Sequence, residues 1–366
     1  MSENTPHPSH VIDPSIRAGN NLANPELDEK VGQVINYFNG EFGLTIDASG
    51  HLEADPTTEQ LARLKGWHEA TSKDGIIMPD MDTFTAKMVL ANALMPQRDE
   101  SGNITYLFGK GAGAELALQG EVDGRSKKVA EVPFRAHSDF EIYGVATDSY
   151  NAIPNSHRFT AVFGSQEIYP VTQTKGLHEL PPDYLHETAE VVSYGGVDFL
   201  VPSLELQFLD KFEKANEAVE RSLREKTDAE WLATTYEMDA DLVHATIDSY
   251  VIAPELAKFK EPAEVAERNT TTLERKLSLT KRRLAEDMPQ ATDKELGSAA
   301  SKDFMLTQFG KNIGLADITA LVNDETGQLV NNSVELLREA EAQRQTAIAS
   351  ALNAKHGQID AILQAA

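Results

Sequence analysis

The chain has 366 residues, of which 41% are hydrophobic and 25% charged, with a formal net charge of −25 and no cysteine. This length predicts two or three structural units, and the lack of cysteine excludes disulfides and thiolate metal sites. The negative field repels phosphates over about a Debye length, about 8 Å at physiological salt, which argues against general DNA binding.

Residues 1–24 are rich in Pro, Asn, Ser and His and lack apolar periodicity, so a disordered arm is expected there. The arm has neither the basic start nor the apolar run of a secretory signal. No stretch of the chain approaches the roughly 18 uncharged apolar residues of a membrane span. We therefore expect a cytoplasmic protein that does not bind membranes.

Residues 25–100 are predicted to form an N-terminal helical region. Asn24 and Pro25 have the residue types that begin a helix, and amphipathic patterns predict two more helices over 57–70 and 79–95. Residues 41–56 are typical of a turn-rich pair of strands with its tip at 48–50. No residue of this region indicates a particular chemistry.

Residues 101–214 are predicted to form an α+β core. Short apolar or alternating runs separated by Pro, Gly, Asn and Asp predict strands at 104–108, 129–134, 139–146, 158–164, 188–194 and 197–201. Helical patterns dominate from residue 204 onward, at 204–225, 227–236, 238–248, 262–286, 292–309 and 331–364. Residues 215–366 are therefore expected to form an all-helical C-terminal domain.

The acidic residues Asp139 and Glu141 are the first indication of chemistry. In a strand they share one face, while Phe140 and Ile142 lie on the other. Half-exposed strands alternate in this way routinely. Two carboxylates one pleat apart also repel each other unless a cation lies between them, and Mg²⁺ prefers carboxylate oxygens completed by phosphate and water.

A glycine-rich turn precedes the acidic pair. Residues 109–113 (GKGAG) follow the predicted strand 104–108 and open an apparent helix. Glycines at such a place let bare backbone N–H groups approach a phosphate. The segment lacks the Gly-Lys-Ser/Thr ending of a P-loop, so an ordinary turn is the alternative.

A third carboxylate and a lysine follow the acidic pair in the sequence. Gly195-Gly196 predicts a tight turn between two strands, and this turn would bring Asp198, Glu190 or neither of them near the first pair as a third acid. Ser203 is expected to cap the next helix, which carries Lys211. A solvent-exposed helix face is the simpler interpretation of Lys211.

The order of these parts resembles the nucleotidyltransferase superfamily with the DNA polymerase β-like minimal fold. Residues 135–142 (RAHSDFEI) are similar to the acid-containing segment of lincosamide-type nucleotidyltransferases. Residues 108–116 (FGKGAGAEL) resemble the glycine segment of abortive-infection toxin-type nucleotidyltransferases, and 201–205 with Lys211 resembles the helix-opening segment of both groups. The sequence departs from these patterns in three places. Ala112 stands where Gly or Ser is usual, Glu141 stands where Asp is commoner, and a loop is inserted at 121–134.

The resemblance implies a mixed-sheet core and a Mg²⁺-dependent transfer of a nucleoside monophosphate from a nucleoside triphosphate. It implies that Asp139 and Glu141 hold the metal and that Asp198, or else Glu190, helps to deprotonate an acceptor hydroxyl. Lys110, Gly111, Gly113, Arg135, His137 and Lys211 are the implied nucleotide-binding residues. The acceptor is open: a small molecule, or, for a toxin-like transferase, tRNA or a protein. The alternative is an inactive member of the fold that serves as a binding or scaffold protein.

Residues 274–283 (ERKLSLTKRR) form a basic stripe on a predicted helix. Such a stripe is usually a solvated face with salt bridges along the helix. A contact with RNA or a nucleotide is the alternative, because a local basic patch can act within an acidic protein.

Overall fold

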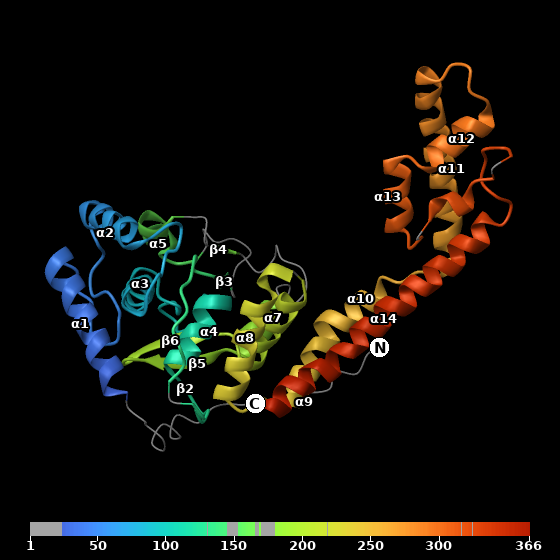
Figure 1. Ribbon diagram of the computed structural model, residues 1–366. Coiled ribbons are helices and arrows are strands. Elements are labelled where there is room, and N and C mark those ends of the chain that lie inside the picture. Colours follow the sequence, from blue (N-terminus) through green and yellow to red (C-terminus); the bar gives the residue numbers. More distant parts are fainter. Residues whose placement is uncertain are drawn as a thin grey trace. The chain divides into compact units, whose positions relative to one another are not determined.

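The computed structural model describes residues 24–129, 131–144, 153–164, 168–169, 180–217, 219–315, 317–323 and 325–366. The arm expected at 1–24 lies outside these residues, except for Asn24. The chain divides into two compact units, Met1–Val251 together with Ile359–Ala366, and Ile252–Gln358 (Figure 1). Across the described ranges, no helix combines the length and the apolar character that crossing a bilayer requires.

The first unit contains both helices and short strands. Its helices are α1 (Pro25–Phe42), α2 (Thr58–Thr71), α3 (Met81–Leu94), α4 (Lys110–Gln119), α5 (Ser156–Phe163), α6 (Pro182–Glu187), α7 (Leu204–Glu217), α8 (Val219–Thr235) and α9 (Ala240–Ile247). Its strands are β1 (Tyr106–Phe108), β2 (Glu121–Val122), β3 (Ile142–Gly144), β4 (Ile168–Tyr169), β5 (Glu190–Tyr194) and β6 (Val197–Val201). The fold class is therefore α+β, as expected.

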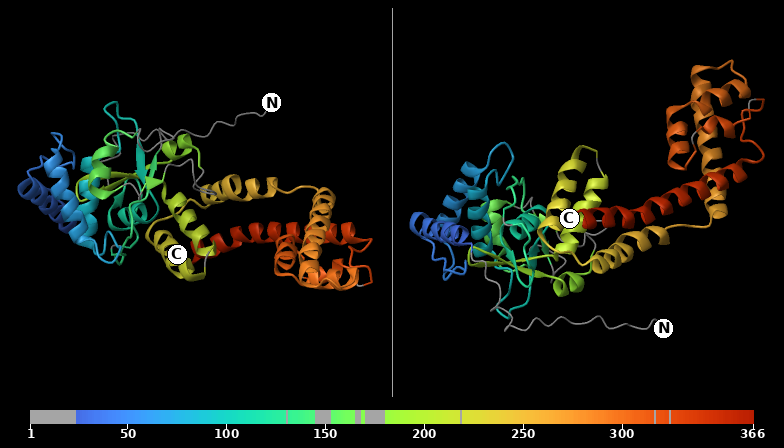
Figure 2. Two further views of the ribbon diagram at one scale, coloured as in Figure 1. Left: turned by 90° about the horizontal axis from the view of Figure 1, so that it is seen from above. Right: turned by 60° about the horizontal axis from the view of Figure 1, so that its bottom comes forward.

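The N-terminal helices begin where the sequence predicts. The Asn24 side chain accepts a hydrogen bond from the Leu27 amide at 3.2 Å, and Thr57 forms a reciprocal capping box with Gln60. Helix α3 is buried along most of its length, and α1, α2 and α3 lie together in all three views (Figures 1 and 2). The bridge between Ile46 and Leu52 closes the predicted turn-rich pair.

A buried lysine holds α3 to the segments around it. Lys87 is fully buried, and its ammonium donates to the carbonyls of His68 and Ile77 and to the Ser72 hydroxyl at 2.6–3.2 Å. His68 is also buried, and its Nδ1 has no hydrogen-bond partner among the described residues. Burial, aided by the Lys87 charge, lowers the pKa of His68 to about 4.

The free energy of unfolding is expected to fall as the pH drops from 7 to 4. In this window the unfolded chain binds a proton at His68 (ordinary pKa 6.5) and the folded chain does not. The difference between the two pKa values of His68 corresponds to about 3 kcal/mol in the free energy of unfolding. Urea unfolding across this pH range should show a shallower slope for His68→Gln than for the wild type. The same change at the exposed His51 should leave the slope unchanged, and equal slopes for all three proteins contradict the assignment.

Two small sheets form the centre of the first unit. One has the order β1-β3-β4, with β1 and β3 antiparallel and β3 and β4 parallel, so it is a mixed sheet as expected. The other has the antiparallel order β2-β5-β6. The Gln97 side chain connects them, because its amide donates to the carbonyls of Leu200 and Tyr106 and accepts from the Leu200 amide.

Two of the predicted strands are wrong. Residues 158–163 belong to helix α5 and Gly164 is its C-cap, because Phe159, Val162 and Phe163 recur at helical spacing and are buried. The rings of Phe159 and Phe163 pack on Phe140. Residues 129–134 form no strand among the positions described there. The other four predicted strands correspond to β1, β3, β5 and β6.

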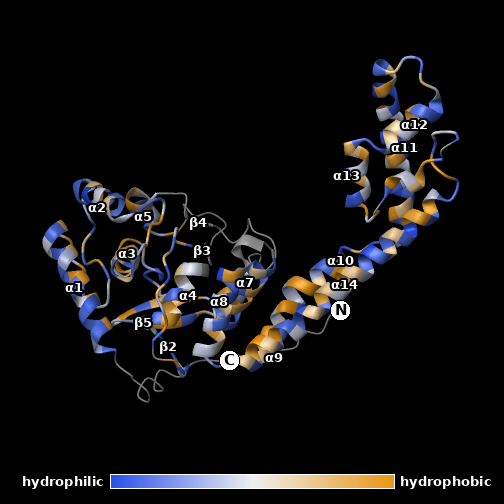
Figure 3. Ribbon diagram, in the orientation of Figure 1, coloured by the Kyte–Doolittle hydropathy of each residue, from blue (hydrophilic) through white to orange (hydrophobic). Residues whose placement is uncertain are grey.

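The second unit is helical. Its elements are the π-helix η5 (Asp248–Ile252), α10 (Ala253–Ala257), α11 (Pro262–Asp287), α12 (Asp293–Ser301), α13 (Phe304–Asn312), the 3-10 helix η6 (Ile318–Leu321) and α14 (Ser333–Ala365). Helix η5 begins in the first unit, and α14 ends in it. The predicted helix 292–309 is divided, because the Asp303 side chain caps a new helix by accepting from the Met305 amide. Hydrophilic and hydrophobic residues alternate along α14 (Figure 3).

Candidate functional site

The start of helix α4 is where the glycine turn and the acidic segment meet. The Gly111 amide donates a hydrogen bond to the Glu141 carboxylate, with 2.7 Å between nitrogen and Oε2. The Gly109 amide donates to the Glu141 carbonyl, also at 2.7 Å. A negative charge is favoured here, because the first amides of a helix have no partner within the helix. The structure therefore places one member of the acidic pair directly at the glycine turn.

The two acids alternate with apolar residues that anchor the segment. Phe140 and Ile142 are fully buried, whereas Asp139 and Glu141 are half-buried. The Phe140 ring packs on Phe163 with 4.7 Å between ring centroids. Although strand β3 begins only at Ile142, the burial pattern follows the predicted alternation.

Two glycines of the turn are required by close approach. A Cβ atom added at Gly111 would lie 2.8 Å from Nδ1 of His137, and one added at Gly113 would lie 2.4 Å from the carbonyl oxygen of Phe108. The second contact involves backbone, which cannot rotate away. Side chains larger than hydrogen would therefore not fit at these two positions without a shift of their neighbours.

Gly111→Ala is expected to destabilise the protein by about 1–3 kcal/mol, since the methyl group overpacks against the buried His137 ring. Urea unfolding measures the change. Gly66→Ala is the matched control, because Gly66 is exposed on α2 and an added Cβ meets nothing within 4 Å. That control should be neutral or stabilising by up to about 1 kcal/mol. Equal stability of wild type and Gly111→Ala contradicts the close approach.

His137 is a buried residue that holds the acidic segment in place. Its amide and carbonyl bond to the backbone of Met78 at 2.9 Å, and its Nε2 lies 3.2 Å from a carboxylate oxygen of Glu115. Burial lowers the pKa of His137. Glu115 acts to raise this pKa, whereas the charges of Lys211 and Arg135 act to lower it further. His137 is thereby fixed between the backbone of Met78 and the Glu115 carboxylate.

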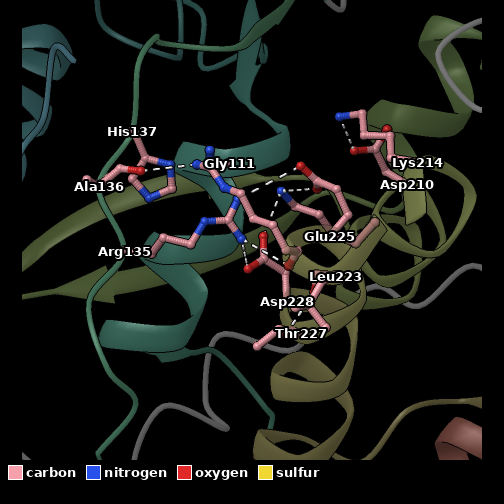
Figure 4. Close-up of polar contacts among 12 residues, drawn as sticks. Gly111, Arg135, Ala136, His137, Asp210, Lys214, Leu223, Glu225, Thr227 and Asp228 are labelled. Atoms are coloured by element: carbon pink, nitrogen blue, oxygen red, sulfur yellow. Dashed lines mark hydrogen bonds and ion pairs between the residues drawn. The ribbon is translucent and has the colours of Figure 1, made fainter. Parts of the chain in front are cut away.

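Arg135 and Lys211 share an ionic network with α8. Figure 4 shows Arg135 beside Glu225 and Asp228 of that helix. Lys211 Nζ lies 3.0 Å from Glu225 and 2.9 Å from Asp228, and the Arg135 guanidinium forms an ion pair with Asp228. Arg224 donates to the Ala136 carbonyl at 3.1 Å. Burial lowers the pKa of Lys211, which the nearby carboxylates only partly offset. Lys211 is therefore not the solvent-exposed residue that its simpler interpretation predicts.

An acid–lysine pair that the sequence reasoning missed lies on α7. Lys214 Nζ is 2.7 Å from Asp210, and Figure 4 shows this pair near the network. Burial works to lower the pKa of Lys214, but the carboxylates of Asp210 and Glu141 outweigh it and the pKa is raised. Burial, with Asp210 and Glu141, also raises the pKa of Tyr143. The signal available in the sequence was the four-residue spacing of Asp210 and Lys214 on a predicted helix.

Neither candidate for the third carboxylate joins the acidic pair. Asp198 lies exposed on β6 and lines a cavity whose described lining, including Asn92 and Arg98, contains neither Glu141 nor Gly111. Glu190 is ion-paired to Arg125 at 2.7 Å and accepts from the Leu204 amide. Within the described ranges, no three His, Asp or Glu side chains form a group that could hold a metal ion. Lys110 is the first residue of α4, and its side chain lies outside what the structure describes.

Comparison with protein-family models, with curated proteins and with solved structures gives no match for this chain.

Proposed function

We propose that the protein is a nucleotidyltransferase whose active centre lies at the start of α4. The hydrogen bond from the Gly111 amide to the Glu141 carboxylate carries this proposal. It brings an acid of the predicted metal-binding pair to backbone donors suited to phosphates. Lys214 and Arg135 lie in the same neighbourhood, each paired with an aspartate (Asp210 and Asp228) whose place a triphosphate would take.

The acids present fit a magnesium ion that is completed by its substrate. Mg²⁺ is commonly held by one or two carboxylates plus phosphate oxygens and water, so two acids together with the phosphates of a substrate are a suitable set of ligands. Asp139 and Glu141 would hold it. When bound, the metal neutralises phosphate charge and makes an acceptor hydroxyl more acidic.

The protein's own groups then have distinct roles. In this proposal a phosphate oxygen takes the place of the Glu141 carboxylate at the Gly111 amide, and Lys214 and Arg135 stabilise the charge that develops on the leaving pyrophosphate. The acceptor oxygen forms a bond to the α-phosphorus while the bond to the β-phosphate bridging oxygen breaks. The hydroxyl proton passes to a carboxylate, for which Asp210 is our candidate, since it acts on the same lysine as Glu141.

The test is to incubate the protein with each radiolabelled nucleoside triphosphate, Mg²⁺ and total cell extract. Label from the α-position should enter one class of acceptor (small molecule, tRNA or protein), and label from the γ-position should leave as pyrophosphate. Binding of triphosphate without transfer supports the inactive alternative instead. That alternative has one observation in its favour, since the charge of Lys211 is already compensated by Glu225 and Asp228. The proposal fails if there is neither binding nor transfer.

A further inference from the structure

The two units of the chain differ greatly in charge. Residues 252–358 contain 14 Lys and Arg against 16 Asp and Glu, a net charge of −2, which leaves −23 for the remainder. Within the second unit, the stretch 275–283 has five cations and no acid. The positive charge is therefore concentrated on the helix α11.

The cations on α11 are not all used in salt bridges. Arg283 pairs with Asp303, Lys281 lies 3.8 Å from Asp293, and Lys276 lies over the Phe309 ring at 5.2 Å. Arg275 and Arg282 are exposed, and neither has a carboxylate partner among the described residues. They are seven residues apart and so lie on one side of the helix, about 10 Å from each other along the axis.

Exposed apolar side chains lie beside these arginines. Leu279, between Arg275 and Arg282 on the same side of α11, is 50% exposed. Phe304 and Met305, the first residues of α13, are 69% and 61% exposed. The Arg283–Asp303 pair brings the start of α13 to α11 one turn away from Leu279, and α13 lies beside α11 in Figure 1. We define Arg275, Leu279, Arg282, Phe304 and Met305 as the α11 patch.

We propose that the α11 patch binds an acidic amphipathic helix of a partner protein. Phe, Met and Arg are enriched in protein interfaces, and apolar side chains exposed together mark interaction sites. The order arginine, leucine, arginine over two turns complements a helix with acid, apolar and acid residues at the same spacing. Leu279 and Met305 offer nothing to a phosphate backbone, which disfavours RNA.

The inference is independent of the proposed function and is tested with the full chain. The probe is a fluorescein-labelled, 18-residue synthetic helix with glutamates flanking a leucine stripe. The comparison probes are a scrambled peptide of the same composition and a labelled 20-nucleotide single-stranded RNA. Fluorescence anisotropy gives each Kd, circular dichroism confirms folding of each variant, and sedimentation reports the oligomeric state.

We expect at least tenfold weaker binding of the scrambled peptide to the wild type. Two double variants of the protein, Leu279→Ser/Phe304→Ser and Arg275→Gln/Arg282→Gln, should also bind the amphipathic peptide at least tenfold more weakly than the wild type does. Lys294→Gln/Lys311→Gln removes the same charge from the same unit and should change Kd less than twofold. Equal binding by all variants overturns the proposal. So does tighter binding of RNA that is insensitive to Leu279→Ser/Phe304→Ser, or a wild-type dimer that these changes dissociate.

Discussion

Replacing Asp139 by Asn is expected to lower the rate of nucleotide transfer at least 1000-fold, about 4 kcal/mol of transition-state stabilisation. The amide keeps the shape of the side chain and removes the charge that a divalent cation requires. Glu141→Gln should have a similar effect on transfer, while its remaining carbonyl oxygen can still accept from the Gly111 amide. The rate of label transfer and the affinity for Mn²⁺ are the two measurements.

The control is Glu131→Gln, which removes an exposed acid from the loop before the same segment. It should leave the transfer rate within twofold of the wild type. Unfolding in urea shows whether each variant retains its stability. If Asp139→Asn folds normally and transfers label at the wild-type rate, Asp139 is not part of a metal site.

Replacing Arg125 by Leu is expected to destabilise the protein by about 3–5 kcal/mol. Its guanidinium donates to both oxygens of Glu205 at 2.9 Å and to Glu190 at 2.8 Å. Glu205 is fully buried, and burial raises the pKa of Glu190 in spite of Arg125. Without the arginine, two carboxylates remain in a poorly solvated site with no counter-charge. Chemical denaturation at pH 7 gives the difference.

Two comparisons distinguish a buried network from a general effect of losing an arginine. Arg338→Leu removes the partner of Glu335 on the exposed side of α14 and should cost about 1 kcal/mol or less. Adding Glu190→Gln and Glu205→Gln to Arg125→Leu should recover part of the lost stability. If Arg125→Leu alone lowers the free energy of unfolding by about 1 kcal/mol or less, the network is contradicted. If the triple variant regains stability, Glu190 is a structural acid.

Helix starts and the alternation of buried and half-buried residues at 139–142 were predictable because they depend on neighbours in sequence. Asn24 and Thr57 cap their helices through bonds within three residues, and Phe140 alternates with the two acids. Residues 158–164 were misassigned because a short apolar run has no decisive period, and only packing of Phe159 and Phe163 on Phe140 selects the helix.

The wider site depends on contacts between distant segments, which a single sequence does not reveal. Lys211 meets Asp228 seventeen residues later, and Glu190 meets Arg125 sixty-five residues earlier. The sequence therefore placed Glu190 among the candidate catalytic acids, whereas its carboxylate is paired with the Arg125 guanidinium. Asp210 was overlooked because a helical acid next to a lysine resembles any surface pair until its burial is known.

The division of charge between the two units has a consequence for how the protein responds to salt. In the part with a net charge of −23, mutual repulsion among carboxylates opposes folding, and the near-neutral segment 252–358 has little of it. Raising the ionic strength from 0.01 M to 0.15 M shortens the screening length from about 30 Å to about 8 Å. Added electrolyte therefore stabilises the acidic unit selectively, and in dilute buffer that unit is the one whose folding the repulsion weakens.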